Sequence, residues 1–377
     1  MDTHESGIAR RDFLRTTSIA ALGLGFNLRP NLAAELLSGS GTAEAREAMM
    51  ANDNIIVGLD IGTSKVRALV GERQPDDTIK ILGAGQAPSL GILSGEVVDS
   101  EAAGKCVREA LVDAEMRTDV RIGRTHLAVF GGPDIHRLGG RVEHCLHCVN
   151  EVGVEVGDVA LRPLASAQAV LDPDQKKLGA LVIDMGAGTT SCIVLADGEI
   201  KGWGVRDVGG ANITDELSLG LRISMATAEK LKRENGSVWF GKAILGEHTV
   251  IEDETGISAQ EVERKMLNAI IHRRVLDTFR RTKVHLEGKG VQLDSLAAGV
   301  HLTGGGSLLP GIDALAQEVF GIPAHLTRAK GIIWAASALE SPEYSCAIGL
   351  LKLGAIRSES SGNTRRRYFW VIPSRVG

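Results

Sequence analysis

The 377-residue sequence has few aromatic side chains, few cysteines and no long apolar run, and each shortage excludes a class of protein. Only seven Phe, four Trp and two Tyr occur. No stretch of 18 uncharged apolar residues is present, so an ordinary membrane-spanning helix is excluded. The cysteines are an odd number, five, and are widely scattered, which favours reduced thiols over a disulfide framework and a cytosolic place for the body of the chain.

An excess of charge of one sign is also lacking. Lys and Arg number 42 against 47 Asp and Glu, a net charge of −5, so no broad basic field exists and no nucleic acid is expected as a partner. Glycine is abundant at 46 residues, and 44% of the residues are hydrophobic. This composition suits an α/β chain with at least two cores and tight turns where backbone approaches a ligand.

The N-terminal region carries a motif at odds with a cytosolic location. Arg10 and Arg11, followed by Asp12, Phe13 and the mildly apolar residues 16–28, resemble a twin-arginine export signal. The alternative is a dispensable extension before a translation start at Met49 or Met50. Residues 1–53 are predicted to be a disordered extension outside the folded body.

Two hairpins of the same design are the central observation. Residues 54–59 and 66–71 predict one pair of strands, and residues 178–184 and 191–196 predict another. Each tip places an acidic residue at the end of a strand, followed by glycines and hydroxyl side chains. The first tip contains Asp60, Gly62, Thr63, Ser64 and Lys65, and the second contains Asp184, Gly186, Ala187, Gly188, Thr189 and Thr190.

The rest of the chain alternates strands and helices by its hydrophobic periodicity. The predicted strands are 79–85 and 125–130, and the predicted helices are 100–116, 159–171, 213–221, 226–233, 258–289 and 308–320. No regular element is predicted over residues 131–150. His144, Cys145, His147 and Cys148 in that stretch are either a metal site or structural thiols, and their spacing favours thiols because no second pair of ligands follows at a usable distance.

The two tips predict a clamp for a nucleoside triphosphate. Its charge needs backbone N–H donors, hydroxyls and a divalent cation to replace water, and glycine-rich tips supply the first two. Asp60 and Asp184 are predicted to hold Mg2+, directly or through water, and Lys65 to add a point charge at the phosphates.

A third glycine turn offers a place for the base and the ribose. Gly304, Gly305, Gly306 and Ser307 follow a predicted strand and precede a helix, so backbone can lie against a flat group. Glu229 and Lys232, three residues apart on one helix, are predicted to reach the ribose and the base. Gly210 and Asn212 belong to the turn that begins the preceding helix and complete the predicted nucleotide-binding set.

These three segments resemble the phosphate 1, phosphate 2 and adenosine motifs of the actin, Hsp70 and sugar-kinase superfamily. Within it the chain most resembles the FtsA family of bacterial cell-division proteins, over residues 54–355. The resemblance implies an α/β, two-lobed, actin-like ATPase fold of duplicated ribonuclease-H-like domains with the nucleotide cleft between the lobes. It also implies ATP and Mg2+ as cofactors and at most weak ATPase activity, since the sequence identifies no general base.

The resemblance also implies a scaffold role in cell division, in which the chain binds the C-terminal tail of FtsZ, links it to the inner face of the cytoplasmic membrane and self-associates. The implied segments are a first lobe at 54–180 completed by 344–356, a second lobe at 181–343 with an outer subdomain at 234–296, and a basic, aromatic tail at 357–377.

Two segments depart from the family pattern. The inserted subdomain of the family is reduced here to a remnant at 125–148, so weak or absent filament formation is expected. The family's terminal amphipathic helix is replaced by residues 357–377, whose basic and aromatic side chains predict either weak membrane contact or a plain disordered tail.

Three other functions remain open from the sequence. A pilus-assembly scaffold of the PilM type shares the fold, and a degenerate paralogue of FtsA would explain the shortened insertion. A sugar kinase is the third, although no clear sugar-binding carboxylate follows the first strands.

Overall fold

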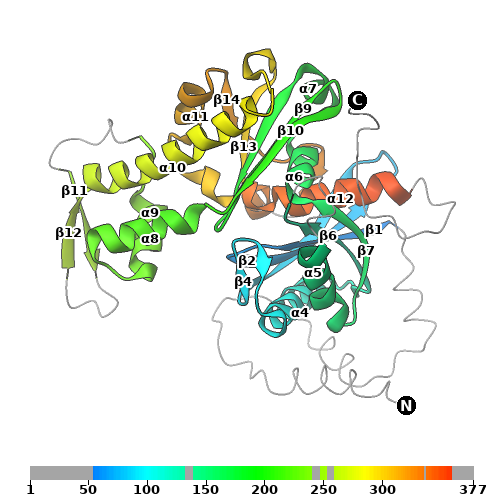
Figure 1. The fold of residues 1–377 in the computed structure, drawn as a ribbon. Helices are drawn as coiled ribbons and strands as arrows, with labels where there is room; N and C mark the ends of the chain where they lie inside the picture. Colours follow the sequence, from blue (N-terminus) through cyan, green and yellow to red (C-terminus); the bar gives the residue numbers. More distant parts are fainter. Residues whose placement is uncertain (1–53, 132–138, 240–246, 253–258, 335–336, 359–377) are drawn as a thin grey trace. The chain divides into compact units, whose positions relative to one another are not determined.

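Two β-sheets of the same topology form the framework in a computed structural model of the chain (Figure 1). The structure describes residues 54–131, 139–239, 247–252, 259–334 and 337–358. The predictions for the N-terminal extension and for most of the C-terminal tail concern residues outside these ranges. Within them, no helix is both long enough and apolar enough to cross a bilayer.

The first sheet has the strand order β15-β3-β2-β1-β6-β7. Three antiparallel strands begin it, and β6 and β7 extend it parallel to β1. The strands are β1 Ile55–Ile61, β2 Lys65–Arg73, β3 Ile79–Pro88, β6 Arg124–Val129, β7 Glu155–Leu161 and β15 Ile332–Ile333. Because β15 pairs with β3, the chain returns to this sheet after completing the second one. A short ribbon, β4 Ile92–Leu93 with β5 Glu96–Val97, lies outside the sheet.

The second sheet repeats this plan in the order β10-β9-β8-β13-β14. Its strands are β8 Ala180–Met185, β9 Thr190–Ala196, β10 Glu199–Arg206, β13 Gly299–Thr303 and β14 Ala324–Leu326. An antiparallel meander again precedes two strands that run parallel to the first. The turn between β9 and β10 is Asp197-Gly198 with both φ angles positive, the pair that a tight hairpin favours. The repetition confirms the expected duplicated α/β fold.

Helices cover the sheets and fill the space between them. Those that pack on or between the sheets are α4 Ser100–Thr118, α5 Gly139–Glu151, α6 Arg162–Val170, α7 Pro173–Leu178, α11 Ile312–Phe320 and α12 Ser345–Ser358. α12 packs on β1 and α6, and α6 also packs on β8 and β9, so these two helices join the sheets through one continuous apolar core.

A smaller group of elements lies beyond the second sheet. It contains α8 Gly210–Leu221, α9 Met225–Asn235, the ribbon of β11 His248–Glu252 with β12 Ala259–Glu263, and α10 Arg264–Glu287. Leu217, Leu267, Ile271 and Phe279 are fully buried in the second core, which binds these helices to the sheet. Short 3-10 turns, η3 Leu293–Ser295, η4 Gly305–Leu308, η5 Ser337–Glu340 and η6 Pro342–Tyr344, connect the later elements.

Several expected elements were wrong in their bounds or kind. Residues 159–161 end β7, and the helix α6 begins only at Arg162, with Pro163 in its first turn. Residues 259–263 are a strand before α10, and α11 begins at Ile312 because Gly311 has φ 81°. Residues 139–151, where no element was expected, form α5, which packs on α4 and connects β6 to β7.

The cysteines and histidines of α5 do not converge. Cys145 and Cys148 are buried in the first core, whereas His144 and His147 are exposed. Burial raises the pKa of the Cys145 thiol to about 12, so it remains protonated at neutral pH. In the described part of the chain, no group of three or more Cys, His, Asp or Glu side chains is placed to hold a metal.

Candidate functional site

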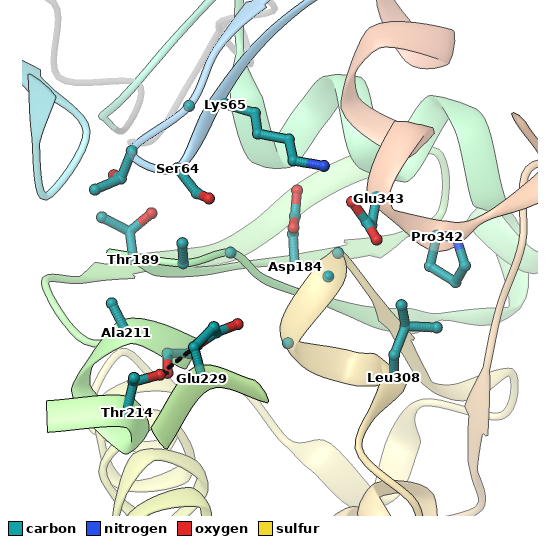
Figure 2. Close-up of a pocket in the computed structure, with 18 of the residues that line it drawn as sticks. Ser64, Lys65, Asp184, Thr189, Ala211, Thr214, Glu229, Leu308, Pro342 and Glu343 are labelled. Carbon is teal, nitrogen blue, oxygen red and sulfur yellow. Dashed lines mark hydrogen bonds between the residues drawn. The ribbon is translucent and has the colours of Figure 1, made fainter. Parts of the chain in front are cut away.

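A cavity of about 700 Å3 lies between the two hairpin tips, and most of the predicted site residues line it (Figure 2). They come from the ends of both hairpins, from α8 and α9, and from the turn after β13. The predicted residues in the lining are Asp60, Gly62, Thr63, Ser64, Lys65, Asp184, Gly186, Ala187, Thr189, Gly210, Glu229, Lys232, Gly304, Gly305 and Gly306.

Four predicted residues are not in the lining, and three of them support the wall through hydrogen bonds. Thr190 Oγ1 donates to the Val208 carbonyl at 2.7 Å, and Ser307 Oγ donates to the Gly304 carbonyl at 2.6 Å. The Asn212 side chain accepts from the Gly209 N–H at 2.8 Å and so caps α8. The fourth residue, Gly188, is not in the lining but touches the opposite hairpin.

The two tips are built alike and meet. The Gly62 N–H donates to the Lys65 carbonyl at 3.1 Å, and the Gly186 N–H donates to the Thr189 carbonyl at 2.8 Å. A Cβ atom at Gly188 would lie 2.6 Å from Thr63 Oγ1, so only glycine allows this approach. The same hydroxyl accepts from the Gly95 N–H at 3.1 Å.

A cluster of three polar side chains joins α8 to α9 at the cavity wall. Lys232 Nζ donates to the Gly210 carbonyl at 2.9 Å, to Thr214 Oγ1 at 2.8 Å and to Glu229 Oε2 at 2.5 Å. Burial opposes ionisation of Glu229, but the hydrogen bonds from Lys232 and Thr214 outweigh it and lower the pKa of Glu229. The Lys232 amine therefore has protein acceptors for its three donors.

The Asp60 carboxylate, 2% exposed, is neutralised by Arg162. The guanidinium forms an ion pair with Asp60 through Nη2, donates from Nη1 to Asp60 Oδ2 at 3.2 Å, and donates from Nη2 to the Ile61 carbonyl at 3.2 Å. Its carbon lies 4.5 Å from the centre of the Phe130 ring. Burial favours the neutral guanidine, yet the charges of Asp60 and Asp184 raise the pKa of Arg162 overall.

Asp184 lies at the floor of the cavity, on the side toward which Lys65 points (Figure 2). Its Oδ2 accepts from Ser166 Oγ at 2.5 Å. Burial raises the pKa of Asp184, although the Arg162 charge and the Ser166 hydrogen bond act in the opposite direction. A Cβ atom at Gly304, whose φ is 83°, would lie 2.3 Å from Asp184 Oδ1, so backbone crowds the second oxygen as well.

These two carboxylates fit direct coordination of Mg2+ poorly. Mg2+ keeps several waters and needs room for an octahedral shell around its carboxylate ligands. Asp60 is almost fully buried against a guanidinium, and both oxygens of Asp184 have close protein neighbours. The positive charge that the pair would attract is already present as Arg162.

Five polar residues of the lining were not predicted from the sequence: Arg67, Arg162, Thr214, Arg233 and Glu343. Arg67 and Glu343 form an ion pair of 2.5 Å, and Arg67 also lies 5.4 Å from the centre of the Tyr344 ring. Arg67 and Glu343 are 276 positions apart in the sequence, so no local pattern reveals this pair. Arg162 had a usable signal, because an arginine followed by proline directly after an apolar strand marks the first turn of a helix.

The paired sheets, the helices between them and the cavity at the hairpin tips define an actin-like ATPase fold. Solved structures with this fold superpose well. MreB5 of Spiroplasma citri bound to ADP has a TM-score of 0.59 at 18% identity, covering 82% of this chain and 99% of that one. The PilM-PilN type IV pilus biogenesis complex has a TM-score of 0.60 at 15% identity, covering 80% of this chain and 98% of that one.

The sequence comparisons narrow this class. The family model described as cell division protein FtsA matches residues 181–349. FtsA of Neisseria meningitidis is 30% identical over 365 residues, which cover 78% of this chain and 88% of that protein. FtsA of Pseudomonas aeruginosa is 27% identical over 387 residues, covering 84% and 92%. The chain belongs to the FtsA family of cell division proteins.

Proposed function

We propose that the chain is an ATP-binding, actin-like scaffold for cell division that links the C-terminal tail of FtsZ to the inner face of the cytoplasmic membrane. The observation that carries the nucleotide part is the convergence of both hairpin tips and the Gly304 turn on one cavity of about 700 Å3. Glycine backbone, hydroxyls and the Lys65 amine are the groups that phosphates require. Membership of the FtsA family favours this scaffold over a pilus scaffold, whose likeness is one of fold alone.

Support for the FtsZ link comes from the family and from exposed apolar side chains on the elements beyond the second sheet. Val250 on β11 is 60% exposed and Met266 on α10 is 47% exposed, which gives an extended peptide apolar contacts to bury. Membrane contact through the tail at 357–377, the cytoplasmic location and the alternative of twin-arginine export rest on the sequence, because residues 1–53 and 359–377 lie outside the described residues.

Blocking the cavity tests the nucleotide part. Ala226, an exposed residue of α9, lines the cavity, so a tryptophan there fills ligand space without disturbing the core. We expect Ala226→Trp to weaken ATP binding by the full-length chain about tenfold or more, as measured by isothermal titration calorimetry. The matched control is Ala314→Trp, at an exposed position of α11 outside this lining. If the two variants bound ATP with equal affinity, the nucleotide would not occupy this cavity.

A further inference from the structure

A buried arginine shares the lining of this cleft with two buried carboxylates. Arg162 is 8% exposed and lines the cavity together with Asp60 and Asp184. It is the first residue of α6, the helix that lies between the two sheets. Arginine does not lose its proton in a protein, so the guanidinium holds a permanent positive charge against these carboxylates.

Several contacts fix the guanidinium in place. Asp60 engages both terminal nitrogens, the Ile61 carbonyl accepts a further hydrogen bond, and the Phe130 ring lies against its face. Pro163 sets the backbone of the first helical turn from which the side chain extends. A side chain held on so many sides cannot leave to make room for a metal without exposing a buried carboxylate.

The other charges of the lining are largely paired. Arg67 is bound to Glu343, and Lys232 to Glu229. Lys65 Nζ has only a long hydrogen bond of 3.4 Å to Gln86 among the contacts of the described residues. Phosphates entering between the hairpin tips would therefore meet the amine of Lys65 and the exposed side chain of Arg233, while the charge of Arg162 offsets the repulsion that Asp60 would otherwise exert on them.

We propose that Arg162 acts as an internal cation in place of a protein-held Mg2+, so that the cleft binds nucleotide phosphates without requiring a divalent metal. This inference rests on the proposed nucleotide-binding function. It predicts that Asp60 serves to hold Arg162 rather than to ligate metal, and that the metal-free and metal-bound forms of ATP bind with similar affinity.

Calorimetry on the full-length wild-type chain tests the inference directly. ATP is titrated once with excess EDTA and once with excess Mg2+. We expect the two affinities to agree within about threefold. A loss of more than about tenfold in EDTA would overturn the inference while leaving nucleotide binding in place. Absence of binding in both conditions would instead refute the proposed function.

A variant tests the role of Arg162 itself. Arg162→Gln removes the charge and frees Asp60, so we expect Mg2+ to strengthen ATP binding about tenfold or more relative to EDTA. Arg162→Lys keeps a cation and should stay insensitive to Mg2+. The control is Arg121→Gln, at an exposed position outside the cavity lining. An Arg162→Gln protein that binds ATP equally with and without Mg2+ would contradict the role given to Arg162.

A metal probe gives a readout that is independent of nucleotide and of the folding of any variant. Electron paramagnetic resonance follows free Mn2+ as it is titrated into the nucleotide-free wild-type chain. We expect no binding of Mn2+ in stoichiometric amount at micromolar concentrations. Stoichiometric binding there would show that the carboxylates accept a divalent cation despite Arg162, and would overturn the inference. If Arg162→Gln does not fold, the Mn2+ titration and the comparison of ATP binding in EDTA and in Mg2+ still test the inference, because both use the wild-type chain.

Discussion

Basic side chains in the cleft differ in what already satisfies them. The amine of Lys232 donates hydrogen bonds to Gly210, Thr214 and Glu229. Among the described residues, the amine of Lys65 has one long hydrogen bond, to Gln86. Sequence spacing placed Lys232 and Glu229 on one face of a helix and assigned them to the ligand. In the structure these two side chains instead join α8 to α9 at the cavity wall.

We therefore expect Lys232→Met to reduce stability. The change removes the Lys232 donor from the Gly210 carbonyl, from Thr214 and from Glu229, which keeps only the hydrogen bond from Thr214, at a cost of about 1 to 3 kcal/mol in the free energy of unfolding. Urea denaturation followed by circular dichroism measures the effect. Lys230→Met, at an exposed position of the same helix, is the control and should change little. Similar losses of unfolding free energy for both variants would mean that the hydrogen bonds of Lys232 do not stabilise the protein.

Among single residues, sequence reasoning found those that depend on local pattern. The acidic and glycine residues of both tips follow apolar strands and were identified from spacing alone. Arg67 and Glu343 were missed because their pairing joins β2 to the turn before α12. Arg162 was missed because its neighbourhood was assigned to a single helix from 159 to 171.

Close packing of α12 is the feature on which the arrangement of elements most depends. A Cβ atom at Gly349 would lie 1.7 Å from the Ala165 carbonyl oxygen of α6, and one at Gly58 of β1 would lie 2.6 Å from the Ala347 carbonyl oxygen. In both contacts the neighbouring atom belongs to the backbone, so no flexible side chain could move aside for an added Cβ atom. The helix is thus held against its neighbours at two glycines.

Alanine at Gly349 is expected to be strongly destabilising. Overlap with the backbone of α6 forces the helices apart, and we expect a loss of about 3 kcal/mol or more in the free energy of unfolding. Gly104→Ala in α4 is the matched control, because its nearest neighbour is 3.8 Å away and alanine favours a helix by up to about 1 kcal/mol. Thermal and urea unfolding compare the two. A Gly349→Ala protein as stable as the control would contradict this packing.

Element prediction succeeded where periodicity was strong and failed where a boundary depended on one residue. The strands of both hairpins were found because alternation and polar tips coincide. The strand β7 and helix α6 were merged because Val159 to Val170 is apolar on both sides of the boundary, and only Pro163 marks the change. The helix α5 was missed because its two glycines and its mixture of His and Cys obscure the buried face.

At the level of the whole molecule, the FtsZ link assigns a partner surface to the elements beyond the second sheet. We expect a fluorescently labelled peptide of the FtsZ C-terminal tail to bind the full-length chain, as followed by fluorescence anisotropy. Met266→Lys should weaken that binding about tenfold, because it places charge on an apolar contact.

The control for this experiment lies in the other half of the molecule. Met116 on α4 is 53% exposed, so Met116→Lys makes the same chemical change far along the chain from the outer elements. Equal effects of the two substitutions would argue against α10 as the binding surface. Absence of peptide binding to the wild type would contradict the FtsZ link and leave the nucleotide proposal unaffected.

The duplicated fold could be predicted from the sequence because both halves repeat one hairpin design. The family resemblance implies a cleft between the halves, but the way α6 and α12 fill the space between the sheets could not be derived from the residues. These helices carry no motif, and their small residues matter only where two backbones meet.

The contact between Gly349 and Ala165 has a mechanical consequence. Two backbones that touch without intervening side chains cannot be compressed, so this contact sets the smallest separation that α6 and α12 can have. Arg162 lies about one helical turn away from this contact on α6. The separation of the two sheets and the position of Arg162 in the cavity wall are therefore set by the same short stretch of α6.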